Sequence, residues 1–320
     1  MNKPNFLTTL IFALCFAAQL VSAPQPARQY ELQALAPAFW KLVPRGAKLT
    51  KFSTGFGFTE GPVWDPHNFL YVSDEVQNKI YRVYPGGRKE EVIALGDPDG
   101  NTYDLQHHLL DCASVRRGII RVGPDGHYTM LAGRYEGKQF NSPNDVVLGP
   151  DHAIYFTDPT LDLPKGQQQE IPFQGVYRLD AHGNVRLLTK DLTQPNGLAF
   201  SPDGKRFYVD DSAQKNIRVY SFAAGTLSGG RIFGDEHSKN YEGVPDGMRV
   251  DVHGDLFVVG PGGIWVWNSQ GEHLGTILMP EQPANLTWGD RDLRTLYITA
   301  RTSVYRLRTR VKGFVPYLRQ

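Results

Sequence analysis

Oxygen-bearing side chains recur at widely spaced but similar positions of the 320-residue sequence. Glu60, Asn144, Asn196 and Asp246 each stand at the start of a similar stretch of nine residues. Two carboxylates and two amides supply hard oxygen donors, and the set contains neither His nor Cys. Such donors suit one divalent cation, with Ca²⁺ as the expected ion and Mg²⁺, Mn²⁺ or Zn²⁺ as alternatives. The four residues therefore predict a metal site.

The same residues also have a purely structural interpretation. Asn-Gly and Asp-Gly are common turn dipeptides, so Asn196 or Asp246 taken alone would be interpreted as a turn former. Glu60 is a poor turn residue, and a turn does not require polar side chains at one aligned position of different repeats. The repetition favours a shared binding site.

Six nine-residue windows that align without gaps define the repeat to which these positions belong. They start at residues 60, 100, 144, 196, 246 and 284. Each window begins as a strand and ends in a turn rich in Pro, Asp, Gly and Asn, and further strands follow, such as Phe69–Val72 and Lys79–Val83. Four strands in a unit of about 45 residues are typical of a propeller blade. The sequence thus predicts an all-β, six-bladed β-propeller with four-stranded blades.

The first residue of each window should lie at one mouth of the central channel, because the innermost strand of every blade lines that channel. The predicted ring is Glu60, Gly100, Asn144, Asn196, Asp246 and Ala284.

The two ends of the chain are expected to close this propeller. The sixth unit ends after its third strand, whereas residues 47–56 precede the first window. Pairing of that N-terminal segment with the last unit would complete the blade and remove a sheet edge. Residues 47–320 then form the propeller, and residues 24–46 lead into it, with a short helix expected within residues 28–43.

Residues 1–23 are similar to an export signal. Lys3 precedes an apolar run from Phe6 to Val21, and Val21-Ser22-Ala23 has the pattern of a cleavage site, with a cut near residue 27 as the alternative. The run is shorter than the roughly 20 apolar residues that a spanning helix needs. We expect an exported protein, periplasmic or secreted, without a stable membrane span.

Charge and cysteine content restrict the function classes. The sequence has 34 Lys and Arg against 33 Asp and Glu, which argues against a nucleic-acid binder with a basic face. Without residues 1–23 the chain keeps Cys112 alone, so it can form no internal disulfide. A lone cysteine in a strand-like stretch predicts a buried apolar residue rather than a nucleophile.

Several motifs, which span the chain after residue 45, resemble the gluconolactonase and senescence-marker-protein (regucalcin) family, and its bacterial gluconolactonase branch in particular. The motifs are Phe58–Trp64 (FTEGPVW), Asn141–Val147 (NSPNDVV), Tyr155–Pro159 (YFTDP), Gln194–Asp203 (QPNGLAFSPD), Val244–Met248 (VPDGM) and Leu296–Ala300 (LYITA). One departure is Ala113-Ser114, where the bacterial relatives tend to carry Glu-His.

The resemblance implies a divalent ion in the channel, often Ca²⁺, with Glu60, Asn196 and Asp246 as ligands. Asn144 would either bind the ion or contact the substrate. The implied activity is hydrolysis of a sugar lactone, whose carbonyl group the ion would polarise. Asp246 is our candidate catalytic residue, which would orient or deprotonate the attacking water. Asn101 is a further candidate contact to the substrate.

Two other functions stay open on the sequence. Related propellers hydrolyse phosphotriesters or fluorophosphates with a similar ring, and a non-catalytic propeller could bind a small metabolite and keep the ion for rigidity. No oligomeric state follows from the sequence.

Overall fold

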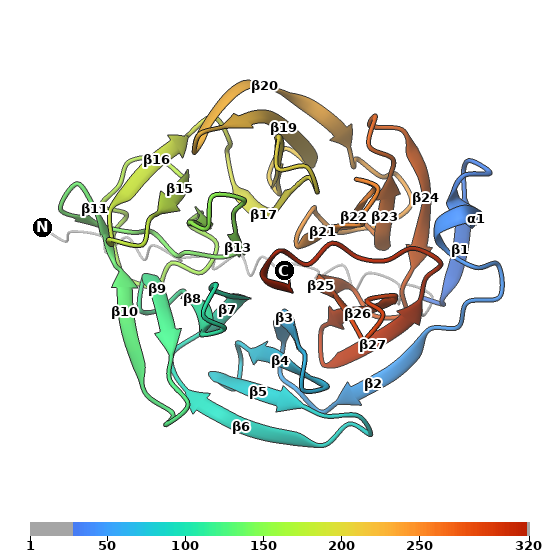
Figure 1. Ribbon diagram of the computed structural model, residues 1–320, viewed down its shortest axis with the longest axis horizontal. Coiled ribbons are helices and arrows are strands. Elements are labelled where there is room, and N and C mark those ends of the chain that lie inside the picture. The colour runs from blue at the N-terminus through green and yellow to red at the C-terminus, as the bar shows by residue number, and fades with distance from the viewer. Residues whose placement is uncertain (1–27, 319–320) are drawn as a thin grey trace, which may run out of the picture.

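The computed structural model describes residues 28–318 and shows six antiparallel sheets around a central channel (Figure 1). Apart from the helix α1 (Phe39–Leu42) and the 3₁₀-helix η1 (Pro316–Leu318), its regular elements are strands. The predicted all-β six-bladed propeller is thereby confirmed. The proposed signal, residues 1–23, lies outside the described residues. No helix among those described is long and apolar enough to cross a bilayer.

Blades one to five each contain four consecutive antiparallel strands, and the first strand of each lies beside the channel in Figure 1. Blades one and two are β3 (Thr59–Asp65), β4 (Phe69–Asp74), β5 (Lys79–Val83), β6 (Lys89–Ala94) and β7 (Pro98–Tyr103), β8 (Leu109–Ala113), β9 (Gly118–Val122), β10 (Tyr128–Ala132). Blades three and four are β13 (Val146–Leu148), β14 (Ile154–Asp158), β15 (Gly175–Leu179), β16 (Val185–Thr189) and β17 (Pro195–Phe200), β18 (Arg206–Asp211), β19 (Asn216–Ala223), β20 (Thr226–Asp235). Blade five is β21 (Met248–Val250), β22 (Leu256–Gly260), β23 (Gly263–Trp267), β24 (His273–Leu278). A short hairpin, β11 (Arg134–Tyr135) and β12 (Lys138–Gln139), follows blade two.

Blade six joins the two ends of the chain. Its strands β25 (Pro283–Gly289), β26 (Thr295–Ala300) and β27 (Ser303–Arg308) come from the C-terminal part, and β2 (Thr50–Thr54) supplies the fourth. The register runs from Thr50 opposite Arg306 to Thr54 opposite Ser303. The predicted closure is confirmed.

Residues 31–34 depart from the expectation of a simple lead-in. They form the strand β1 (Glu31–Ala34), which pairs with β24 and gives blade five a fifth strand. The short helix α1 follows, within the expected residues 28–43, and buries Phe39 and Leu42. The N-terminal segment is therefore attached to blade five before it reaches blade six.

The second strand of each blade is buried along almost its whole length, because each blade packs against a neighbour on both faces. In blade five, every residue of β22 and of the third strand β23 is buried. Aromatic rings fill the interface between blades three and four, where the ring of Phe200 lies 4.8 Å from that of Tyr155 and 4.7 Å from that of Phe207. Cys112 is fully buried, as predicted.

After β27 the chain turns back across the channel towards its centre (Figure 1). The Phe314 amide donates a hydrogen bond to the Val250 carbonyl of blade five at 2.9 Å. The Tyr317 hydroxyl donates to the Trp64 carbonyl of blade one at 3.0 Å. The C-terminal segment thus ties blades five and one together at the end of the channel where their inner strands finish.

A stacked histidine in blade five gives the fold a predicted acid sensitivity. The His273 ring lies 4.3 Å from that of Trp265 and 4.7 Å from that of Trp267. Burial lowers the pKa of His273 to about 4, although the Gly275 carbonyl lies 3.1 Å from its Nε2. The neighbouring carboxyl of Glu236 accepts a hydrogen bond from Trp267 Nε1, and burial holds the pKa of Glu236 well above its usual range.

The unfolded chain would therefore protonate His273 first as the pH falls, so the free energy of unfolding should fall between about pH 6.5 and about pH 4. We expect this decrease in the free energy of unfolding to be about 2 kcal/mol smaller in His273→Gln, which has no imidazole to protonate. The value allows for the partial exposure of the ring, which weakens the effect of burial. Urea denaturation of both proteins at about pH 7 and about pH 4.5 measures it. Equal losses in the two proteins would contradict the prediction.

Candidate functional site

The register of the blades defines the ring at the channel mouth. In blade four, Pro195 pairs with Asp211 and Leu198 with Val209, and Asn196 lies in the irregular step between them. Blade two repeats this pattern, with Pro98 opposite Ala113 and Asn101 opposite Asp111. The residue equivalent to Asn196 in blade two is therefore Asp99.

The predicted ring position Gly100 was therefore wrong by one residue. A second observation supports Asp99. When Asp99 is taken as the ring residue of blade two, the residue eight positions after the ring residue has a positive φ in each of blades one to five. These residues are Asn68, His107, His152, Gly204 and Gly254. The sequence did contain a signal for Asp99. Asp99-Gly100 matches the dipeptides Glu60-Gly61, Asn196-Gly197 and Asp246-Gly247.

Glycines after the ring residues let neighbouring blades approach closely at the channel. A Cβ atom on Gly61 would lie 2.1 Å from the Asp99 carbonyl oxygen, and one on Gly197 would lie 2.2 Å from that of Asp246. Only a residue without a side chain permits such contact. The main chains of successive ring residues are thereby held side by side, which fixes the spacing of their side chains.

Hydrogen bonds hold the predicted ligands Glu60 and Asn196 in place. Glu60 Oε2 accepts from the Gly61 amide at 2.7 Å and from Asn285 Nδ2 at 2.9 Å. Asn196 donates from Nδ2 to the Ser212 hydroxyl at 3.2 Å, and its side chain also bonds the Asp246 carboxylate. Asn285, one residue after the ring position of blade six, was missed by the sequence analysis.

Burial and crowding raise the pKa values of the ring carboxyls. The pKa of Glu60 is raised to about 7, chiefly by burial and also by the charge of Asp145. Burial, followed by the charge of Glu60, holds the pKa of Asp246 well above its usual range. The pKa of Asp99 is raised in the same direction by burial and by nearby carboxylates. Carboxylates crowded in this way are stabilised in their charged form by a cation.

The ring therefore fits a hard divalent cation in its donor chemistry. Among residues 28–318, no group of three or more His, Cys, Asp or Glu side chains is arranged to hold a metal ion. The predicted ligand set is not such a group, because two of its four donors are the amides of Asn144 and Asn196. Glu60, Asn144, Asn196 and Asp246 would hold the ion by oxygen atoms alone, as Ca²⁺ prefers.

A second group of carboxyls surrounds the ring and lies outside the nine-residue windows. Burial raises the pKa of Glu75 to about 10, with further contributions from Glu60 and Asp162. Asp97 has a pKa raised to about 6 by burial and by Asp162. Asp162 comes from the loop between β14 and β15, where its amide donates to the Ser142 hydroxyl at 3.2 Å. The site is strongly acidic beyond its four predicted ligands.

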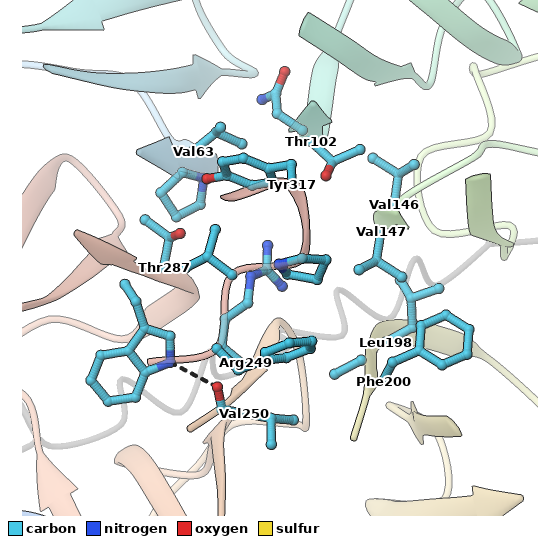
Figure 2. A pocket seen from close by; sticks show the side chains of 17 residues that line it. Val63, Thr102, Val146, Val147, Leu198, Phe200, Arg249, Val250, Thr287 and Tyr317 are labelled. Carbon is cyan, nitrogen blue, oxygen red and sulfur yellow. Dashed lines mark hydrogen bonds between the residues drawn. The ribbon is translucent and has the colours of Figure 1, made fainter. Parts of the chain in front are cut away.

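The channel is filled on the other side of the ring. Arg249 lies in its centre, among residues of the inner strands and the C-terminal segment (Figure 2). Its Nη1 lies 3.6 Å from Asp145 Oδ2 and donates to the Met248 carbonyl at 2.7 Å. The remaining cavity measures about 30 Å³, enough for one or two water molecules. A substrate must therefore reach the ring from the opposite mouth.

Asn101, which the sequence predicts as a contact to the substrate, forms hydrogen bonds with blade one. Its side chain is 1% exposed. The Nδ2 atom donates to the Gly61 carbonyl at 2.9 Å and to the Ser73 hydroxyl at 2.6 Å. Asn101 therefore links blades one and two beneath the ring.

Aspartates at the ends of second strands hold the loops that lead to the ring. Asp211 accepts from the amides of Thr193 and Gln194 at 2.6 and 3.1 Å, just before Asn196. It also accepts from the Gln214 amide of the following turn at 3.1 Å. Asp74 plays the same part for Gly57 in blade one.

Known proteins resemble the chain in sequence and in fold. A gluconolactonase of Zymomonas mobilis is 35% identical over 284 residues, which cover 80% of each chain. The solved structure of a gluconolactonase from Xanthomonas campestris superposes with a TM-score of 0.81 at 31% identity, over 89% of this chain and 99% of that one. The calcium-binding protein regucalcin of Agrobacterium tumefaciens, at 22% identity and a TM-score of 0.70 over 83% of this chain and 95% of that one, shares the fold.

The match to a family is equally broad. Residues 58–302 match the family described as SMP-30/Gluconolactonase/LRE-like region. This stretch contains the inner strands of all six blades and every residue of the ring. The chain therefore belongs to the SMP-30/gluconolactonase/LRE-like family.

Proposed function

We propose that the protein hydrolyses a small sugar lactone with the aid of one divalent cation, of which Ca²⁺ fits best. The observation that carries the proposal is the ring of Glu60, Asn144, Asn196 and Asp246 at one mouth of a channel that is filled below. Relatives named gluconolactonase and pentonolactonase support the substrate class. Export, which residues 1–23 predict, is part of the proposal.

The bound cation would polarise the lactone carbonyl and stabilise negative charge on its oxygen. Asp246 is the ring carboxylate best placed for proton transfer, because its side chain is partly exposed whereas Glu60 is 4% exposed. The hydrogen bond from Asn196 orients its carboxylate. Asp246 takes a proton from the attacking water as the new C–O bond forms. It returns that proton to the ring oxygen as the ester bond breaks, and the open-chain acid leaves.

Metal dependence is tested by hydrolysis of glucono-1,5-lactone in a pH-stat. Protein stripped of metal should show only the spontaneous rate, and Ca²⁺ should restore turnover better than Mg²⁺, Mn²⁺ or Zn²⁺. Turnover independent of any added cation would contradict the metal requirement. If no cation gave turnover with this or other lactones, the two alternative functions would be tested on the same samples. Hydrolysis of a phosphotriester would test the phosphotriesterase alternative, and binding of aldonic acids would test the metabolite-binding propeller.

A further inference from the structure

The ring contains a third carboxylate that the proposed ligand set does not use. The strand register places Asp99 at the position that Asn196 occupies in blade four and Asp246 in blade five. The side chain of Asp99 is 3% exposed, and its charge is close enough to Glu60 for each to influence the other. Blade two therefore contributes an acidic side chain to the channel mouth.

This carboxylate makes a direct contact with one of the proposed ligands. Asn144 Nδ2 donates a hydrogen bond to Asp99 Oδ2 at 2.7 Å. This bond engages the amide nitrogen of Asn144, which can only donate. Oδ1 is then the acceptor atom of Asn144 left to bind a cation or a substrate hydroxyl.

Asp99 is itself held firmly by its surroundings. Its amide donates to Asp111 Oδ2 at 3.2 Å, and its carbonyl accepts from the Ser73 hydroxyl at 2.7 Å. The Ser114 hydroxyl lies 3.5 Å from Asp99 Oδ2 and donates to the Pro143 carbonyl, one residue before Asn144, at 3.0 Å. These contacts keep the carboxylate pointed at Asn144.

We propose that Asp99 is a positioning residue of the cation site: it fixes the amide of Asn144 with Oδ1 available to the ion, and its charge strengthens cation binding. The inference rests on the proposed function, because it assumes that the ring binds a divalent cation. It goes beyond that function by assigning two separable effects to Asp99, one of orientation and one of charge.

Two substitutions separate these effects. Asp99→Asn keeps an oxygen that can accept from Asn144 but removes the charge, whereas Asp99→Ala removes both. Calorimetric titration with Ca²⁺ alone should show a Kd raised about tenfold in Asp99→Asn and about 100-fold in Asp99→Ala. Glu236→Gln is the matched control, since it also removes a buried carboxyl of raised pKa, one that accepts from Trp267 rather than from a residue of the ring. Its Kd should stay within about twofold of the parent value.

A double-mutant cycle tests whether Asp99 acts through Asn144. In an Asn144→Ala background, Asp99→Ala should weaken Ca²⁺ binding by much less than it does in the parent protein. If the losses of Ca²⁺ affinity in the two single variants multiplied to give the loss in the double variant, the positioning role would be overturned. Unchanged Ca²⁺ binding in Asp99→Asn would overturn the contribution of charge. Thermal unfolding checks each variant, and the isosteric Asp99→Asn carries the test if Asp99→Ala does not fold. A parent protein that binds no Ca²⁺ would refute the proposed cation site itself, a result distinct from a failure confined to the Asp99 variants.

Discussion

Asp246→Asn should reduce kcat for lactone hydrolysis by about 10³-fold, the range expected when a positioned base is lost. The substitution keeps the shape of the side chain and an oxygen for the hydrogen bond from Asn196, but the amide cannot accept a proton from water. It also removes one negative charge from the ring. Steady-state kinetics at saturating Ca²⁺, together with a Ca²⁺ titration, separate the loss of the base from weaker ion binding.

Asp251→Asn provides the matched control for this prediction. Asp251 is buried on the same blade, five residues further along, and has a pKa raised to about 6 by burial. It caps the turn after β21 by accepting from the amides of His253 and Asp255, so it should not affect kcat. Turnover by Asp246→Asn within about tenfold of the parent would exclude Asp246 as the base. Ligand binding without turnover in the parent protein would favour a metabolite-binding propeller.

Gly61→Ala should lower the free energy of unfolding by about 3 kcal/mol and abolish Ca²⁺ binding. Gly61 has a φ of 49°, and a Cβ atom there would lie 2.1 Å from the Asp99 carbonyl oxygen and 2.3 Å from Asn101 Nδ2. Blades one and two would have to separate at the channel mouth. Glu60 would then move relative to the rest of the ring, so stability and ion binding should fail together.

Gly86→Ala separates backbone strain from this steric clash. Gly86 also has a positive φ, of 89°, but no atom lies within 4 Å of the position that its Cβ would occupy. It should cost about 1 kcal/mol and leave Ca²⁺ binding unchanged. Urea denaturation and Ca²⁺ titration of both variants measure the difference. Equal destabilisation by the two substitutions would show that the approach of blades one and two does not require a glycine.

Local patterns allowed the sequence to predict most of the architecture. Blades one to five are each formed by consecutive strands, so the signal of each lies within about 45 residues. The missing strand of the sixth unit predicted the pairing of β2 with β27, because an unpaired sheet edge is unfavourable. Glu60, Asn144, Asn196 and Asp246 could be singled out because they recur at one position of this repeat.

The strand β1 shows where local pattern was insufficient. Its four residues, Glu-Leu-Gln-Ala, carry too short an alternation to indicate a strand, and its partner β24 lies more than 200 residues away in the sequence. In blade two, a gapless alignment selected Gly100 because it could not detect the irregular pairing step that places Asp99 in the ring.

The tertiary structure decided how the ring is supported. The contacts of Asn285 with Glu60, of Asp99 with Asn144 and of Arg249 with Asp145 all join different blades. Such pairs have no fixed separation in the sequence, because they depend on how closely neighbouring blades pack around the channel. The sequence by itself therefore determined the repeat, the closure and the candidate ligands. Packing between blades determined which side chains orient those ligands and which end of the channel is open to a substrate.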